Sequence, residues 1–109
     1  MKLYIKRPRS NVDAIAEYDI QSKTFTVLKG SILSKKIAHS EKFRGAKSIE
    51  KSRNGNVKQN KLINDITFKS SSTAANFVTG ASTNGLIAWK DENGKSLKDI
   101  LIGLEGKNE

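Results

Sequence analysis

The sequence predicts a small α+β domain, in which an antiparallel sheet of four to six short strands packs against two or three helices. Within residues 14–19, Ala14, Ala16 and Tyr18 alternate with a second set of side chains, a pattern typical of a strand with one covered face. Residues 97–104 instead repeat leucine and isoleucine at helical spacing. A chain of 109 residues fits one domain, and we expect its core within residues 3–104 and a frayed tail at residues 105–109.

The first third of the chain predicts three short strands, at residues 3–5, 14–19 and 25–28. The second and third are joined by residues 21–23, which are typical of a hairpin loop. Residues 32–42 show only a weak pattern, and we interpret them as a loop that contains Lys35, Lys36 and the single histidine, His39.

The middle of the chain predicts a helix at residues 43–53 and a strand at residues 62–68. Three apolar side chains recur at helical spacing and would form the buried side of the helix: Phe43, Ala46 and Ile49. Three basic side chains share another face: Arg44, Lys47 and Lys51. This basic face either contacts phosphate groups or is simply solvated, and the sequence favours neither interpretation.

The stretch from residue 68 to residue 90 has the clearest local plan. The serines at residues 70–72 are typical N-cap residues, because a side-chain oxygen there accepts a hydrogen bond from an orphan backbone amide. A short helix follows and ends at Gly80, where a left-handed C-cap belongs. Asn84 and Gly85 predict a tight turn, since both tolerate positive φ, and residues 86–89 predict a buried strand. The expected core anchors are Phe25, Phe68, Phe77, Trp89 and Leu97.

Positive charge is concentrated in the middle of the chain. The formal net charge is +9, and residues 21–69 carry twelve basic and three acidic side chains. Such clustering is the electrostatic pattern expected of a polyanion-binding protein, although a soluble basic protein with a solvated face would also show it. There is no cysteine and no apolar run of about 20 residues that could span a membrane. We therefore expect a cytoplasmic protein.

The motifs with catalytic associations are incomplete. Gly94-Lys95-Ser96 resembles the end of a phosphate-binding loop, but the glycine required five residues earlier is Trp89. With one histidine and no cysteine, the sequence offers no nucleophile–base pair and no metal-ligand spacing. We expect no enzymatic activity, no cofactor and no metal.

Several segments carry a family resemblance. They are the serine and small-residue pattern at residues 68–75, the glycine, asparagine and tryptophan pattern at residues 80–90 with Gly94 and Leu97, and residues 25–31, 44–55 and 65–68. Together they resemble an accessory domain of unknown function that is often found C-terminal to GIY-YIG endonuclease domains, and they are similar to the restriction-enzyme adenine-methylase-associated domain. The resemblance spans roughly Tyr4 to Leu104. It departs from the family pattern at Ser71, where proline is usual, and at Thr73, where a small residue is usual. The GIY-YIG motif itself is absent.

The resemblance implies association with restriction, modification or repair enzymes and the sensing of modified bases. Combined with the charge, it leads us to expect a non-catalytic DNA-binding accessory module; the alternative is a protein-interaction module that docks a nuclease or methylase subunit. The candidate nucleic-acid contacts are Lys29, Ser31, Arg44, Lys47, Lys51, Lys58, Lys69, Ser70, Ser72, Asn84 and Lys90. For Ser70, Ser72, Gly85 and Trp89, a purely structural role is the simpler interpretation.

Overall fold

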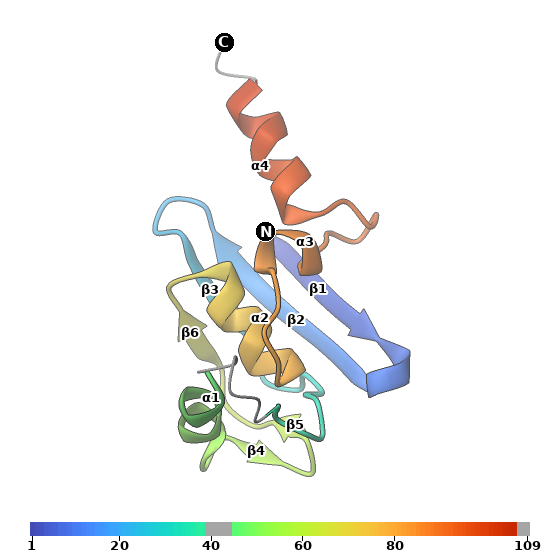
Figure 1. Ribbon diagram of the computed structural model, residues 1–109. Helices are drawn as coiled ribbons and strands as arrows, with labels where there is room; N and C mark the ends of the chain where they lie inside the picture. Colours follow the sequence, from blue (N-terminus) through green and yellow to red (C-terminus); the bar gives the residue numbers. More distant parts are fainter. Residues whose placement is uncertain (39–44, 107–109) are drawn as a thin grey trace.

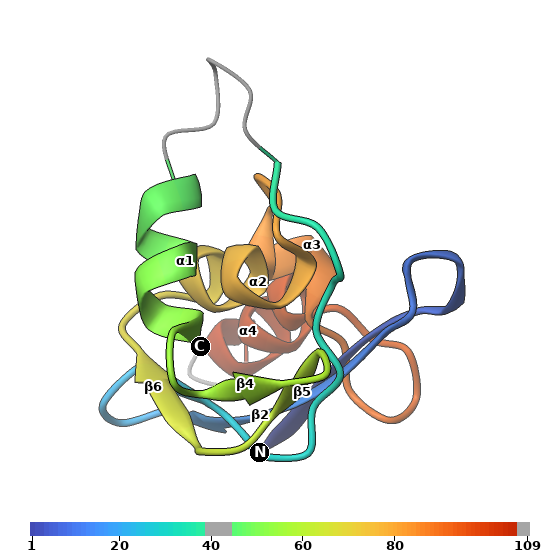
Figure 2. The same ribbon diagram turned by 90° about the horizontal axis from the view of Figure 1, so that it is seen from below.

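The computed structural model describes residues 1–38 and 45–106, and a four-stranded antiparallel sheet lies at its centre. The strands are β1 (Lys2–Arg7), β2 (Val12–Asp19), β3 (Thr24–Val27) and β6 (Ile66–Phe68), in the spatial order β1-β2-β3-β6. Along β2, every second residue from Val12 to Tyr18 is buried. The helices lie over one face of the sheet only (Figure 2). The strand with one covered face, predicted from the alternation, is therefore confirmed.

A second, smaller sheet lies with helix α1 at one end of the molecule (Figure 1). Helix α1 spans Ala46–Arg53, and the small sheet pairs β4 (Val57–Lys58) with β5 (Lys61–Leu62). Ile32 joins the two sheets, because it forms bridges with Asp13 of β2 on one side and with Lys61 of β5 on the other.

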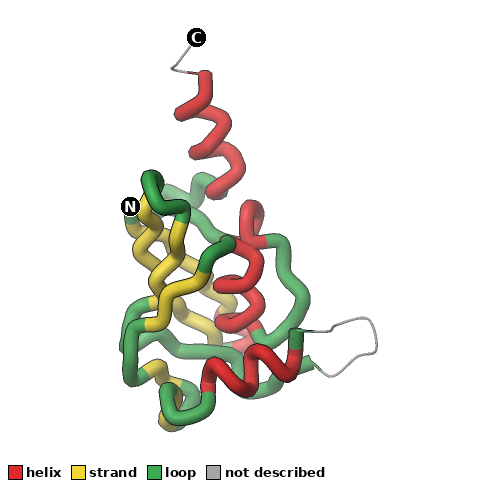
Figure 3. The backbone as a smooth tube through the Cα atoms, turned by 90° about the vertical axis from the view of Figure 1, so that its left-hand side faces the viewer, coloured by secondary structure: helices red, strands yellow, loops and turns green. Residues whose placement is uncertain are grey.

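The other helices follow the sheet in sequence. Helix α2 (Ser71–Thr79) packs on the covered face, with a short helix α3 (Gly85–Ala88) beside it, while α4 (Leu97–Gly106) extends at the end opposite α1 (Figures 1 and 3). A single 3-10 turn, η1 (Pro8–Ser10), connects β1 to β2.

The core lies between the sheet and α2. Trp89 and Phe77 are its largest fully buried side chains, and Phe25 and Leu97 are also buried. Phe68 is half-buried and packs against Phe77, with the ring centroids 5.0 Å apart. The five expected anchors therefore come together in one cluster, with Phe68 at its margin.

Two predicted strands are wrong. Residues 86–89 do not form a buried strand: residues 85–88 are helical, and Leu86 and Ile87 are 38% and 48% exposed. Residues 62–68 do not form one continuous strand either. The chain turns at residues 63–65, so that β5 pairs with β4 while β6 pairs with β3.

The predicted fold class is confirmed, with antiparallel sheets of four and two strands. The described residues contain four α-helices, one more than predicted, because α3 replaces the expected strand. Helix α1 begins at Ala46, and residues 43 and 44 of the predicted helix lie outside the described residues. Helix α4 reaches Gly106, past the expected start of the frayed tail. No helix in the described part of the chain has the length and apolar character needed to cross a bilayer.

Candidate nucleic-acid interface

Of the three serines at the start of α2, Ser70 caps the helix, while Ser71 and Ser72 hold α2 and α3 together. Ser70 is the N-cap of α2, and its Oγ accepts a hydrogen bond from the Thr73 amide at 3.1 Å. The Ser72 Oγ accepts one from the Gly85 amide at 3.1 Å. The Trp89 Nε1 donates one to the Ser71 carbonyl at 3.0 Å. A Cβ at Gly85 would overlap the peptide between Ser71 and Ser72, so the two backbones are in direct contact.

Asn84 has a capping role and not the left-handed turn conformation that the sequence predicted. Its φ is −77°, and its Oδ1 accepts a hydrogen bond from the Leu86 amide at 3.1 Å, which makes it the N-cap of α3. This cap explains why residues 85–88 become helical, since an N-cap satisfies an amide that a helix start leaves unpaired. The amide nitrogen of this exposed side chain remains able to donate outward.

Among the residues that the structure describes, seven exposed cations gather around the end of the molecule formed by α1, β4 and β5. Helix α1 contributes Lys47 and Lys51, and β4 and β5 contribute Lys58 and Lys61 (Figure 1). The others are Arg9 of η1 and, from the segment that follows Ser34, Lys35 and Lys36. We call these seven residues the basic end.

The segments of the basic end are fastened to one another by specific contacts. The Leu33 amide donates a hydrogen bond to the Asn60 carbonyl at 2.8 Å, which ties the lysine-bearing segment to the β4–β5 turn. Ile37 lines a shallow depression together with Lys47 and Lys51 of α1. The cations therefore occupy neighbouring parts of one surface, although they come from five segments of the chain.

Few carboxylates accompany these cations. Within residues 8–11, 31–38 and 45–62, Glu50 is the one acidic side chain. No carboxylate of the described residues lies within ion-pair distance of any of the seven cations. At the opposite end, by contrast, β2 carries Glu17 and Asp19, and α4 carries Asp99 beside Lys98. The field of the molecule is therefore strongly positive at one end.

Arg53 lies on α1 but is used inside the molecule. Its guanidinium donates hydrogen bonds to the Phe77 carbonyl at 2.7 Å, the Ser34 carbonyl at 2.9 Å and the Ser34 Oγ at 3.0 Å. Burial lowers the pKa of this guanidinium from its ordinary value. These bonds anchor α1 and the lysine-bearing segment to the C-terminus of α2, where a cation also complements the helix dipole.

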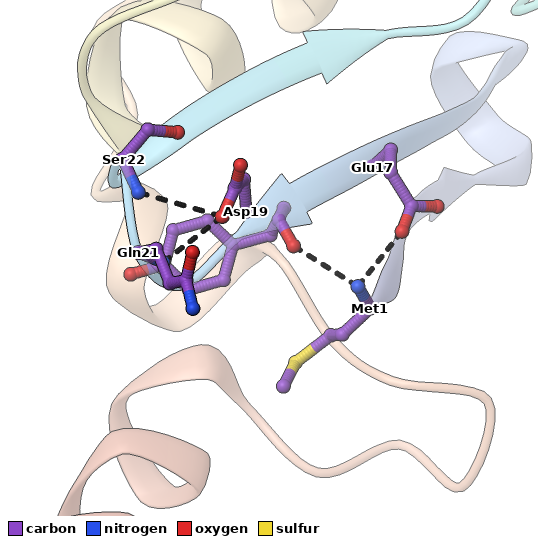
Figure 4. Close-up of polar contacts among 6 residues, drawn as sticks. Met1, Glu17, Asp19, Gln21 and Ser22 are labelled. Atoms are coloured by element: carbon purple, nitrogen blue, oxygen red, sulfur yellow. Dashed lines mark hydrogen bonds and ion pairs between the residues drawn. The ribbon is translucent and has the colours of Figure 1, made fainter.

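The β2–β3 hairpin at the other end contains the one carboxylate with a resolved pKa shift among the described residues. Asp19 Oδ1 accepts a hydrogen bond from the Gln21 amide at 2.9 Å and one from the Ser22 amide at 3.4 Å (Figure 4). The Gln21 amide is the largest cause that lowers the pKa of Asp19. Beside it, the Met1 amine donates to Glu17 at 2.8 Å and to the Tyr18 carbonyl at 2.9 Å. These contacts fix the hairpin.

The predicted nucleic-acid contacts divide into two groups. Lys47, Lys51 and Lys58 are exposed at the basic end. Ser70, Ser72, Asn84 and Lys90, with Lys69 beside Ser70 in the chain, lie on or next to the α2–α3 unit, and the structure does not bring them to the basic end.

Three predicted contacts need separate comment. Ser31 is 4% exposed, and its Oγ accepts a hydrogen bond from the Ile15 amide at 3.1 Å, so its hydroxyl lies inside the protein and we remove it from the interface. Lys29 is exposed, but its backbone amide donates to the Asp65 carboxylate at 2.7 Å, which places an acidic group beside it. Arg44 lies outside the described residues.

The list of predicted contacts omitted four cations of the basic end, Arg9, Lys35, Lys36 and Lys61. The charge count already included the three lysines. Arg9 lies outside residues 21–69, and only the β1–β2 turn brings it to this surface.

The structure thus defines a small α+β domain with a cluster of exposed cations at one end. The chain belongs to a family of domains of unknown function, DUF4357, whose sequence pattern matches residues 4–101. The match covers almost all of the span of the family resemblance, residues 4–104. No curated protein and no solved structure is significantly similar to the chain.

Proposed function

We propose that this protein is a cytoplasmic, non-catalytic DNA-binding accessory module that contacts the DNA backbone through the basic end. The observation that carries the proposal is a set of seven exposed cations from five described segments, with one acidic side chain within residues 8–11, 31–38 and 45–62. Lysine and arginine side chains on one surface supply the sequence-independent part of DNA binding by neutralising phosphates and releasing counterions.

The arrangement of the basic end favours contact with phosphates over direct readout of bases. Its cations lie on a two-residue strand pair, a two-turn helix and two connecting segments. The major groove admits one α-helix or one two-stranded ribbon, whereas these cations are spread over a helix, a strand pair and two connecting segments. Contacts of this kind fix the position of a protein on DNA and carry no sequence information by themselves.

The wider biological role rests on the family resemblance. It supports a link to restriction-modification or repair nucleases and methylases. The most specific version of this proposal is that the protein senses modified bases. A comparison of binding to unmodified and adenine-methylated duplexes of one sequence tests that finer form. Equal affinity for both duplexes would limit the proposal to binding of the DNA backbone that does not depend on base modification.

The test of the proposal uses two charge-matched double variants. Lys47→Gln with Lys51→Gln removes two charges from α1, and Lys95→Gln with Lys98→Gln removes two from the opposite end (Figure 1). We expect fluorescence anisotropy at fixed salt to show weaker DNA binding for the α1 variant and little change for the variant of Lys95 and Lys98. Equal losses in the two variants would mean that net charge, and not this surface, determines binding.

The alternative function, docking of a nuclease or methylase subunit, is favoured by a groove between β1 and α3. The groove has a volume of about 540 Å³, and its walls include Tyr4, the half-exposed Ile87 and three cations, Lys6, Arg7 and Lys90. Ile87→Asp should then abolish co-purification with the partner subunit and leave DNA binding intact. Loss of DNA binding in this variant would instead make the groove part of the DNA interface.

Asn84 and Lys90 remain predicted DNA contacts beside this groove. Asn84→Ser retains a side-chain oxygen for the cap and the same charge but removes the amide donor, so it separates folding from binding. An unchanged melting temperature with weakened DNA binding would support direct contact by the amide. Unchanged binding by Asn84→Ser and by Lys90→Gln would restrict the interface to the basic end.

A further inference from the structure

A pocket of about 550 Å³ opens within the basic end, between the β1–β2 turn and the segment after Leu33. Arg9 and Asn11 form one wall and Lys35 and Lys36 the other, while Asn60 and Thr79 close it from the β4–β5 turn and from the C-terminus of α2. The lining residues come from four separate parts of the chain, so the pocket exists only in the folded domain.

The charges around this pocket suit an anion. Three of its lining residues are cations, and none of its lining residues is acidic. Its floor includes Ser34, which is 5% exposed and accepts hydrogen bonds from Arg53 through both its carbonyl and its Oγ. The guanidinium of Arg53, which is bonded to Ser34, therefore adds a fourth positive charge next to the pocket.

The C-terminus of α2 would otherwise oppose anion binding at this place, because a helix C-terminus carries partial negative charge. Here two of its carbonyls are already bonded. Phe77 accepts from Arg53 at 2.7 Å, and Val78 accepts from the Ser34 amide at 2.9 Å. The positive charge of Arg53 therefore offsets part of the negative potential that this helix end directs towards the pocket.

The shape of the pocket distinguishes between two kinds of phosphate. The phosphodiesters of a continuous duplex lie on a convex cylinder. Such phosphates reach only the rim of a recessed pocket. A phosphate at the end of a strand projects from the duplex and can enter the recess. It also carries about −1.5 to −2 charge at pH 7, as a phosphorylated side chain does, against a single charge on a phosphodiester. Arginine, lysine and asparagine side chains, all present in the lining, are donors that suit such a group.

We propose that this pocket binds the terminal phosphate of a DNA strand. The proposal rests on the proposed function, since it takes the basic end as the DNA-binding surface, and it adds a preference for phosphorylated strand ends over continuous duplex. Either strand end can supply this group, as a 5′-phosphate or as a 3′-phosphate.

The experiment measures affinity for four versions of one duplex, each labelled internally. One version is closed at both ends by hairpin loops, one has hydroxyl ends, one has 5′-phosphates and one has 3′-phosphates. We expect one of the phosphorylated duplexes to bind about tenfold more tightly than the hydroxyl-ended and closed ones, the gain expected of an additional hydrogen bond to a charged group. The phosphorylated end that gains affinity identifies the source.

The variants separate the pocket from the rest of the basic end. Lys35→Gln with Lys36→Gln, and independently Arg9→Gln, should abolish the preference for phosphorylated ends. Lys58→Gln with Lys61→Gln is the matched control, because these lysines belong to the same end but do not line the pocket. This control should weaken binding to all four duplexes equally and preserve the preference. Melting temperatures verify that each variant is folded.

Three results would overturn the proposal. Equal, salt-sensitive affinity for all four duplexes would rule out the pocket as a site for terminal phosphates and leave the proposed function intact. A preference that persists in both pocket variants would place the phosphate elsewhere. Absence of binding to every duplex would overturn the proposed function together with the pocket.

Discussion

The indole nitrogen of Trp89 donates a hydrogen bond to the backbone carbonyl of Ser71, 3.0 Å away, inside the core. The two residues stand 18 positions apart and belong to the serine and tryptophan parts of the same sequence motif. The bond joins the start of α2 to the residue that follows α3. Much of the serine and tryptophan motif is therefore explained by the contacts that join α2 to α3.

Trp89 should be the largest single contributor to stability among the side chains of this unit. Trp89→Ala should lower the free energy of unfolding by about 3–5 kcal/mol, because it leaves a large cavity in a fully buried position. Trp89→Phe retains much of the apolar volume and loses the hydrogen bond, so it should cost less. Urea denaturation measures both variants. A loss below about 1 kcal/mol for Trp89→Ala would show that the ring is not a core anchor.

Gly85 should tolerate no side chain. A Cβ there would overlap the peptide between Ser71 and Ser72, so Gly85→Ala should destabilise the domain by about 1–3 kcal/mol or more. Gly103 is the matched control, because it lies in α4 with only the Lys95 Nζ near its Cβ position, at 3.8 Å. Gly103→Ala should stabilise the helix by about 0.5–1 kcal/mol. Effects of the same sign in the two variants would contradict the close contact at Gly85.

The sequence predicted the elements whose signals are local. Ser70 acts as the expected N-cap of α2, and Gly80 ends that helix with a φ of +73°. The strand over residues 14–19 follows from an alternation that needs no knowledge of its partners. These signals depend on backbone chemistry within a few residues, which is why they can be recognised without the tertiary structure.

Other features depend on contacts between distant segments. A run of four apolar residues at 86–89 fits a strand or a helix, and only the cap by Asn84 and the packing of Gly85 on α2 decide between them. The internal role of Arg53 requires the C-terminus of α2 to lie beside α1. The pocket of the basic end likewise requires the β1–β2 turn to bring Arg9 to Lys35.

Arg53 and Lys51 are both basic residues on α1, but substitution of Arg53 should lower stability, whereas substitution of Lys51 should weaken DNA binding. Arg53→Met should cost about 1–3 kcal/mol of stability, because buried carbonyl groups at the C-terminus of α2 lose their donor. Lys51→Met should stay within about 0.5 kcal/mol of the wild type but weaken DNA binding, since its ammonium is exposed. Melting curves and anisotropy on the same two proteins make the comparison. A Lys51→Met protein that is destabilised but binds DNA normally would contradict the assignment of Lys51 to the DNA-binding surface.

Asp19 should make the domain sensitive to acid. Because hydrogen bonds from the Gln21 and Ser22 amides lower its pKa in the folded state, its contribution is complete above the pKa of the unfolded chain. That contribution is lost as the pH falls through the lower, folded-state value, below about pH 4. Asp19→Asn should therefore flatten the acid limb of melting temperature against pH. A limb that is equally steep in the variant would assign the acid sensitivity to other carboxylates.

The salt dependence of DNA binding tests the account most directly. The logarithm of affinity should fall linearly with the logarithm of salt concentration, with a slope of about −0.9 for each phosphate contacted. A variant with four substitutions at the basic end (Lys35→Gln, Lys36→Gln, Lys47→Gln and Lys51→Gln) should have a slope shallower by about 3–4. A control with four substitutions elsewhere (Lys2→Gln, Lys23→Gln, Lys95→Gln and Lys98→Gln) should keep the wild-type slope. A wild-type affinity that does not change with salt, or equal flattening in the two variants, would contradict the assignment of DNA binding to the basic end.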